Sequence, residues 1–375
     1  SSCQNGVSCA SGVCVLGSDG SGTCGGDKLS KNCIEIDPTD NNKCKTCYNL
    51  TLNANKQCCP ENCLDCDRDG KCKDGKCASG KYLDNNECVA IPTETVYGLA
   101  ADATNEEAVS KIFKAKGRPA HNPLIIHVKN IKMAQQYVQW NEAAEILTKK
   151  FWPGPLTIVL PSTKNSQIAK TARANLPSVA IRMPSHPVAL EILRQFNRPL
   201  AAPSANLSGK ISSTSIDHVL KNLNQKIDAI VDGGNSTVGV ESTIVTLTRV
   251  PTILRTGFIT PEAVSNALGA KIANYDNDGP IIAPGQLKSH YAPKAKLRLD
   301  AIDWRQGEKK LGFGDVDCDM NLSKGKSLSE AAQNLFNFLH VLDSFNPRTI
   351  SVSPIPNEGI GLAINDRLKR ASIQE

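Results

Sequence analysis

Polar side chains follow several short apolar runs of this sequence, at the points where those runs end. Arg182 ends the run that begins at Val179, Ser204 and Asn206 follow a run of small residues, and Arg255 directly follows Leu254. In open α/β sheets, ligands collect at the ends of strands. Guanidinium, hydroxyl and amide groups are the ones that hold phosphates. These positions therefore predict a site for an anionic, phosphate-bearing ligand.

A lysine lies on the apolar side of a predicted helix. Thr104 and Glu107 have the spacing of a capping box, and the apolar stripe that starts at Val109 continues to Lys116, where Gly117 ends the helix. A lysine on the core-facing side needs an anionic partner, because burying an unpaired charge is costly. Alternatively, Lys116 is a cation that stabilises the C-terminal end of the helix dipole. The spacing leaves both interpretations open.

His127 lies within the apolar run Leu124–Val128, which is typical of a buried strand. A histidine there is either a hydrogen-bonded core residue or a catalyst. The sequence contains neither GxxxxGK[ST] nor GxGxxG. The usual P-loop and dinucleotide-binding sites are therefore excluded.

Strands and helices alternate from Val89 onward, which indicates an α/β protein. The run Val89–Ile91 predicts a short buried strand. Further on, strands are expected at 296–299, 310–313 and 349–354, with a helix that begins at Ser327. These later elements predict a small α/β domain without a site of its own, in which Cys318 is a free thiol.

The first part of the chain has a different composition. Of the 15 cysteines, 14 fall between Cys3 and Cys88. Such a segment cannot bury a conventional core, so disulfides are expected to replace it, and residues 1–88 are predicted as a disulfide-type segment with little regular structure. Two CxxC pairs, one at Cys44 and one at Cys63, leave zinc as the alternative.

Charge divides the chain in the same way. Residues 1–89 sum to −2 and the remainder to +8, an excess that suits a part handling nucleotides or approaching RNA, or that reflects scattered solvated charge. The chain has no apolar run of about 18 residues, so a membrane span is not predicted. With 21% charged residues, wholesale disorder is excluded.

Several sequence motifs occur in the same order as in the long, two-domain form of the threonylcarbamoyl-AMP synthase family, which this chain resembles. They are Pro92–Leu99 (PTETVYGL), Lys116-Gly-Arg118, Phe151–Thr157 (FWPGPLT), Ser204-Ala-Asn206, and Ala283-Pro-Gly followed by His290-Tyr291-Ala-Pro293. The resemblance runs from about Val89 to the end of the chain. It implies a twisted mixed-sheet catalytic domain at 89–273, a linker at 274–294 and a small Rossmann-like α/β domain at 295–375. The family's usual first helix is missing ahead of Val89.

The resemblance implies a reaction and its partners. L-threonine, bicarbonate and ATP, with Mg²⁺ carried by the nucleotide, would give threonylcarbamoyl-AMP and pyrophosphate. The product would supply a tRNA threonylcarbamoyl transferase that modifies adenosine 37 of tRNA, and a weak direct contact with tRNA is a further expectation. No residue needs to act as a covalent nucleophile, and the location would be cytoplasmic for residues 89–375.

The resemblance also implies site residues, motif by motif. Lys116 and Arg118 are expected to be catalytic. The expected ATP contacts are Asn122, Ser178, Ser204, Asn206, Ser212 and Arg255. The expected threonine contacts are Thr95, His127, Arg182, Ala202 and Ser242. His290 and Tyr291 would belong to a lid that closes over the site, the alternative being a plain interdomain linker.

Residues 58–88 resemble the furin-like repeats of cysteine-rich surface proteins of protists, which implies an extracellular compartment. Because disulfides need an oxidising space while tRNA modification is intracellular, we hypothesise a chimeric or truncated gene model. The first residues, Ser-Ser-Cys, also lead us to expect that the true beginning lies upstream. The alternative function is a disulfide-rich surface protein in which the synthase part is an inactive passenger.

Overall fold

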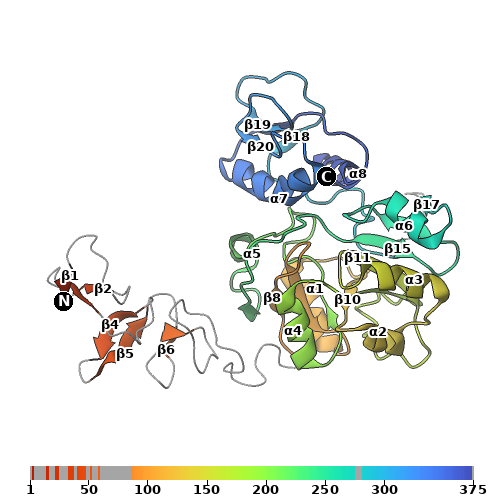
Figure 1. Ribbon diagram of the computed structural model, residues 1–375, viewed down its shortest axis with the longest axis horizontal. Helices are drawn as coiled ribbons and strands as arrows, with labels where there is room; N and C mark the ends of the chain where they lie inside the picture. Colours follow the sequence, from red (N-terminus) through yellow and green to blue (C-terminus); the bar gives the residue numbers. More distant parts are fainter. Residues whose placement is uncertain are drawn as a thin grey trace. The chain divides into compact units, whose positions relative to one another are not determined.

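The computed structural model describes residues 86–274 and 281–373 and, before them, several short strands between Ser2 and Cys59 (Figure 1). The chain divides into two compact units, residues 1–81 and 82–375.

The first unit contains short antiparallel strands. β1 (Ser2–Cys3), β3 (Gly22–Cys24) and β2 (Cys14–Leu16) pair in that order, β4 (Cys33–Asp37) pairs with β5 (Asp40–Cys47), and β6 (Thr51–Leu52) pairs with β7 (Cys58–Cys59). The cysteine side chains of this unit, and residues 60–85, lie outside the described residues. The disulfide, zinc and furin-like interpretations of this segment therefore stay predictions.

A ten-stranded sheet forms the centre of the second unit, within its described residues. Its strands are β8 (Val89–Ile91), β9 (Gly98–Asp102), β10 (Ile125–His127), β11 (Leu156–Pro161), β12 (Ser178–Arg182), β13 (Leu200–Ala201), β14 (Ala229–Ile230), β15 (Thr243–Thr246), β16 (Thr252–Arg255) and β17 (Ala273–Asn274). They lie in the order β14-β8-β9-β13-β10-β12-β11-β15-β16-β17. The pairs β14/β8, β10/β12, β11/β15 and β16/β17 are parallel and the other neighbours antiparallel, which confirms the mixed sheet.

Helices cover the two faces of this sheet differently. They are α1 (Glu106–Lys116), α2 (Ile131–Tyr137), α3 (Glu142–Phe151), α4 (Pro187–Phe196), α5 (Ile216–Leu223) and α6 (Pro261–Leu268). All but α4 contribute to the core on one face, whereas α4 packs on the second face beside β8 and β13.

The rest of the second face is covered by a segment without regular structure. There Ile125 and Ala180 pack against Ala283, which belongs to residues 281–293, called the linker segment below. Side chains alternate between the faces along a strand, so His127 and Arg182, two residues further on, point to this same face. The linker segment and these two side chains therefore enclose a common space.

The helix α1 begins one residue later than expected. Asn105, not Thr104, is the N-cap, and its side chain accepts from the backbone N–H groups of Glu107 and Ala108. The Thr104 hydroxyl instead donates to Asp102 Oδ1, 2.7 Å away. The other end is as predicted, because Gly117 adopts φ 61° and closes the helix after the buried Lys116.

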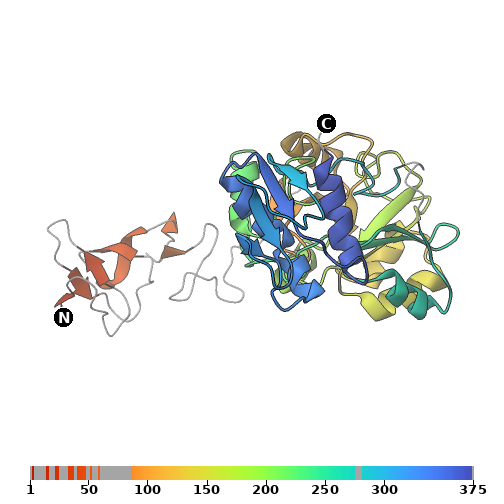
Figure 2. The same cartoon turned by 90° about the horizontal axis from the view of Figure 1, so that it is seen from above.

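The C-terminal domain contains a four-stranded parallel sheet, ordered β18-β21-β19-β20, with two helices. Its elements are β18 (Lys296–Arg298), β19 (Lys309–Gly312), β20 (Met320–Asn321), α7 (Leu328–Ser344), β21 (Thr349–Val352) and α8 (Gly361–Ser372). Figure 2 looks down onto this domain, shown in blue, in front of the domain that contains the ten-stranded sheet. Parallel pairing confirms the Rossmann-like expectation. Within the described part of the chain, none of the helices combines the length and hydropathy that crossing a bilayer requires.

Ser327 caps α7 as predicted, and its hydroxyl accepts from Glu330 N at 3.3 Å. The reciprocal half of the capping box is absent, because the Glu330 carboxylate accepts instead from the Ser323 hydroxyl at 2.5 Å. The helix α8, which follows the loop after β21, was not predicted from the sequence.

Cys88 belongs to the core of the second unit, not to the disulfide-type segment predicted for residues 1–88. It is a free thiol, 1% exposed, and packs with the core that contains Tyr97 and Leu99. Its backbone N–H donates to Asp228 Oδ2 at 2.7 Å, and its carbonyl accepts from Asp228 N at 3.0 Å. Asn86 also donates to the α1 residue Glu107. The packing of the second unit therefore extends back at least to Asn86. Cys318 is free, as predicted.

Candidate active site

A cavity lies between the second face of the sheet and the linker segment. It is lined by Thr93, Thr95, Val96, Gly98, Arg118, Ile125, His127, Arg182, Ala202, Pro203, Ser204, Glu241, Ser242, Arg255, Pro284, Gly285, His290 and Tyr291. Ten of the fifteen predicted site residues are among them. Strand pairing explains the convergence: the last residues of the parallel strands β10 and β12, His127 and Arg182, are register partners.

Arg182 is held at the cavity by a carboxylate and a hydroxyl from the loop between β8 and β9. Its guanidinium donates to Glu94 Oε1 at 2.5 Å, to Thr95 Oγ1 at 2.9 Å and to the Gly154 carbonyl at 3.2 Å. Burial raises the pKa of Glu94, but the charge and hydrogen bond of Arg182 outweigh it and hold that pKa below its usual value. The other oxygen, Glu94 Oε2, is buried with no partner in the structure.

His127 is a neutral group in this wall. Its Nδ1 lies 3.3 Å from the Ile125 carbonyl. Burial and the charge of Arg182 lower the pKa of His127 to about 3. The sequence left open whether it was a core residue or a catalyst. It is buried and lines the cavity, where at neutral pH it offers an uncharged ring nitrogen to a ligand.

Lys116 and Arg118 are oriented by backbone carbonyls. Lys116 Nζ donates to the carbonyls of Ser204 at 2.5 Å and Asn206 at 2.6 Å. Arg118 donates through Nε to Asn122 O at 3.1 Å and through Nη2 to Pro123 O at 2.8 Å. Burial and the charge of Arg118 lower the pKa of Lys116. Lys116 is thus directed into the protein and does more than stabilise the helix end.

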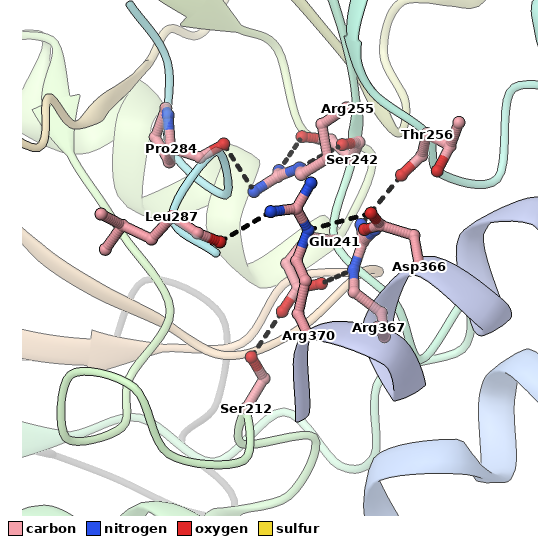
Figure 3. A network of polar contacts seen from close by, with 10 residues as sticks. All are labelled: Ser212, Glu241, Ser242, Arg255, Thr256, Pro284, Leu287, Asp366, Arg367 and Arg370. Atoms are coloured by element: carbon pink, nitrogen blue, oxygen red, sulfur yellow. Dashed lines mark hydrogen bonds and ion pairs between the residues drawn. The ribbon is translucent and has the colours of Figure 1, made fainter. Parts of the chain in front are cut away.

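A second buried arginine approaches from β16. Arg255 donates through Nε to the Ser242 carbonyl at 3.1 Å and through Nη2 to the Ser242 hydroxyl at 3.2 Å (Figure 3). The Ser242 hydroxyl also lies 2.7 Å from Thr157 Oγ1. Burial and the nearby charge of Arg255 lower the pKa of Arg118 to about 9. Cations that repel one another across a cavity are stabilised by a polyanion bound between them.

The linker segment closes the cavity with His290 and Tyr291, both buried. Their rings contact edge to face at 4.0 Å between centroids. His290 Nδ1 is buried without a partner in the structure, and burial and the charge of Arg118 lower the pKa of His290. Gly285 adopts φ +87°, and a Cβ there would lie 2.6 Å from Arg255 Cδ, so only glycine lets the linker pass this close to the arginine.

Five predicted residues do not line the cavity: Lys116, Asn122, Ser178, Asn206 and Ser212. Lys116 contacts the cavity wall through its hydrogen bond to the Ser204 carbonyl and also donates to the Asn206 carbonyl. The amide oxygens of Asn122 and Asn206 are buried and have no hydrogen-bond partner among the described residues. The Ser212 hydroxyl donates to Glu241, which does line the cavity. Ser178 begins β12, at the opposite end of the strand from Arg182, and the structure does not bring it to the others.

Three charged residues at the site were not predicted from the sequence: Glu94, Glu241 and Arg367. Glu94 and Glu241 are buried carboxylates beside predicted residues, and each pairs with an arginine far along the chain. Arg367 lies on the buried stripe of α8 together with Ala363, Ile364 and Ala371. A charged residue on an apolar helical stripe is the signal that singled out Lys116, and it was available for Arg367 as well.

Two family models match this chain, and curated relatives match it over most of its length. The family model described as "Telomere recombination" matches residues 81–257, and the one described as "Threonylcarbamoyl-AMP synthase, C-terminal domain" matches residues 259–372. The threonylcarbamoyl-AMP synthase of Pyrococcus abyssi is 39% identical over 314 residues, which cover 78% of this chain and 92% of the relative. That of Bacillus subtilis is 40% identical over 315 residues, covering 77% and 90%.

A solved structure has the same fold. The crystal structure of P. abyssi Sua5 complexed with L-threonine superposes with a TM-score of 0.69 at 37% identity, covering 76% of this chain and 91% of that one. Since relatives matched over about nine-tenths of their length share this level of identity, the chain belongs to the threonylcarbamoyl-AMP synthase family.

Proposed function

We propose that residues 82–375 join L-threonine, bicarbonate and ATP into threonylcarbamoyl-AMP and release pyrophosphate. The observation that carries this proposal is the cavity itself, which is lined by Arg118, Arg182 and Arg255, with Arg182 paired to the Glu94 carboxylate. Anionic substrates with a phosphate chain at one end and a carboxylate at the other fit such a distribution of charge.

The nucleotide would lie against Lys116, Arg118 and Arg255. Ser204 lines the cavity. The buried amide oxygens of Asn122 and Asn206 lie outside its lining, and they would accept from an adenine or ribose group of an ATP molecule that extends beyond it. Ser212 would act through Glu241, and contact with Ser178 would need an ATP pose that extends beyond the cavity.

Threonine would bind at the Arg182 side. The guanidinium would hold its carboxylate, with Thr95, His127, Ala202 and Ser242 around its side chain and amine. The P. abyssi relative was solved as a complex with L-threonine, which supports this amino acid as a substrate here.

The chemistry then requires positioning. The threonine amine and bicarbonate give a carbamate and water, and a carbamate oxygen attacks the α-phosphorus of ATP. A new O–P bond forms while the bond to the β-phosphate oxygen breaks, and pyrophosphate carries away the electron pair. Lys116, Arg118 and Arg255 would stabilise the charge on the phosphates, and His290 and Tyr291 would exclude water. No side chain needs to form a covalent bond.

Mg²⁺ would enter with the nucleotide phosphates, whose charge it would help to neutralise. Within the described residues, no three His, Cys, Asp or Glu side chains gather as they would around a metal held by protein alone. Glu241 is the carboxylate of the cavity wall, and both of its oxygens already accept hydrogen bonds, from Ser212 and Arg367.

The product would pass to a tRNA threonylcarbamoyl transferase in the cytoplasm, and a weak contact with tRNA belongs to the same proposal. The alternative, an extracellular surface protein with an inactive synthase part, depends on residues 1–81, as does the hypothesis of a chimeric gene model. Transcripts that span codons 80–100 continuously would contradict a chimera.

Pyrophosphate release by the full chain tests the proposal. Release should require ATP, threonine and bicarbonate together, and mass spectrometry should detect threonylcarbamoyl-AMP. Arg118→Met should lower both signals by about 10²–10³-fold, while the exposed Arg194→Met should leave them unchanged. A full chain that folds but forms no adenylate would show that the synthase part is a passenger.

A further inference from the structure

The C-terminal domain places a buried arginine against Glu241, a residue of the cavity wall. Arg367 of α8 is one of the largest fully buried side chains of the described residues. Its Nε donates to Glu241 Oε2 at 2.8 Å, its Nη2 to the Thr256 carbonyl at 2.9 Å and its Nη1 to Asp366 at 2.7 Å (Figure 3). The hydrogen bonds to Glu241 and Thr256 cross from one domain to the other.

Glu241 occupies a critical place in that wall. It lines the cavity next to Ser242, whose carbonyl accepts a hydrogen bond from Arg255. Its second carboxylate oxygen accepts from the buried Ser212 hydroxyl. Arg255 and Arg367 both act electrostatically on this carboxylate, so Glu241 is a potential partner for either arginine. Of these two arginines, Arg367 is the one that donates a hydrogen bond to the Glu241 carboxylate.

The same helix also forms hydrogen bonds with the linker segment. Arg370 donates to the Leu287 carbonyl at 2.6 Å and accepts at its own carbonyl from His290 N at 3.2 Å. The Arg367 guanidinium lies 5.3 Å from the centre of the Tyr291 ring. Asp366 joins the two arginines, accepting from Arg367 at 2.7 Å and from Arg370 at 2.9 Å. One turn of α8 therefore contacts the cavity wall and the segment that covers it.

We propose that Arg367 is a positioning residue of the synthase reaction, which neutralises Glu241 so that Arg255 stays available to the nucleotide. This inference rests on the proposed function. Without Arg367, the Glu241 carboxylate is left unpaired in a buried wall, where it turns to Arg255 and repels the phosphates of ATP. The C-terminal domain thereby controls the charge of a cavity whose lining residues, within the described part of the chain, all come from Thr93 to Tyr291.

Calorimetric titration of the full chain with Mg-ATP tests this without relying on turnover. Arg367→Met should weaken ATP binding by about 10-fold or more, since one buried carboxylate then opposes the ligand. Adding Glu241→Gln to that variant should restore affinity to within about threefold of the Glu241→Gln single variant, because the offending charge is gone. A purely structural role predicts no such rescue.

The matched control is Arg298→Gln. Arg298 is also a C-terminal-domain arginine paired with a carboxylate, Glu308, at 2.5 Å, but it lies away from the cavity. It should leave ATP affinity unchanged. An Arg367→Met variant that binds ATP as tightly as this control would overturn the proposal, and so would a double variant no better than Arg367→Met.

Arg367→Lys covers the case in which the methionine variant does not fold. A lysine keeps the charge that neutralises Glu241, so ATP affinity should stay within about threefold of wild type. A folded lysine variant that binds ATP about 10-fold more weakly would refute the neutralising role. If the wild type binds ATP but forms no adenylate, the proposed function fails while the titrations still decide on Arg367.

Discussion

Arg182 and Glu94 form a buried ion pair, 2.5 Å between Nη2 and Oε1, with their side chains only 4% and 7% exposed. Removing one partner leaves an uncompensated charge at the floor of the cavity. Glu94→Ala should therefore lower the free energy of unfolding by roughly 3–5 kcal/mol. All three tryptophans lie between Trp140 and Trp304, so urea unfolding followed by their fluorescence reports on this part of the chain.

The control for this pair is Glu191→Ala. Glu191 pairs with Arg194 at 2.6 Å, but both side chains are about half exposed or more. Solvent screens such pairs, so this substitution should hardly change the unfolding midpoint. Equal midpoints for the Glu94 and Glu191 variants would mean that the buried pair does not stabilise the fold.

Arg118 should not be replaceable by lysine. Its guanidinium donates to two carbonyls, of Asn122 and Pro123, while it lines the cavity. An ammonium cannot reproduce this forked geometry. Both Arg118→Met and Arg118→Lys should lower kcat/KM for ATP by about 10²–10³-fold in the pyrophosphate assay. Wild-type activity of the lysine variant would show that only charge at this position matters.

Two histidines should make stability sensitive to acid. His218 of α5 stacks on His340 of α7, with ring centroids 3.9 Å apart, and His340 Nε2 lies 3.1 Å from the Ser212 carbonyl. Burial lowers the pKa of His218 to about 4 and, together with the charge of His218, that of His340 to about 3. Unfolded histidines bind protons near pH 6.5, so stability is complete above that pH and falls as pH drops toward 4.

The variant that checks this is His340→Gln, whose side chain does not titrate. Each buried histidine contributes about 1.4 kcal/mol of lost stability per pH unit below pH 6.5. Between about pH 6.5 and 5.5, the variant should thus lose roughly 1 kcal/mol less than wild type in urea unfolding. Identical pH profiles would contradict a neutral, buried His340.

Cys88 should be chemically silent in the folded protein. Burial, and secondarily the charge of Asp228, raise the pKa of its thiol to about 12. Iodoacetamide at neutral pH should label the partly exposed Cys318 and leave Cys88 unlabelled until urea is added, as read by peptide mass spectrometry. A Cys88 peptide recovered in disulfide linkage from native protein would show that this residue belongs to the cysteine-rich segment after all.

Local patterns in the sequence determined the alternation of strands and helices, the buried position of Lys116, and four of the cavity-lining residues, which are His127, Arg182, Ser204 and Arg255. The family resemblance supplied the other predicted residues. Lys116 is the clearest case, because helical spacing alone placed its side chain on the buried stripe. Polar residues at the ends of β10, β12 and β16 also follow from local pattern, since a strand ends where its apolar run ends. The ordered family phrases added the expected reaction.

Only the tertiary structure decided which charges meet. Arg182 pairs with Glu94, which is 88 residues away in the sequence, and Arg367 pairs with Glu241, which is 126 residues away. No periodic pattern in the sequence predicts either ion pair, because the pairs depend on strand register and on how α8 packs against the catalytic domain. Burial then sets the protonation states of these groups, and burial is a property of the packed molecule, not of any segment. For the same reason, Cys88 looked like the last cysteine of one segment and proved to be a core residue of the next.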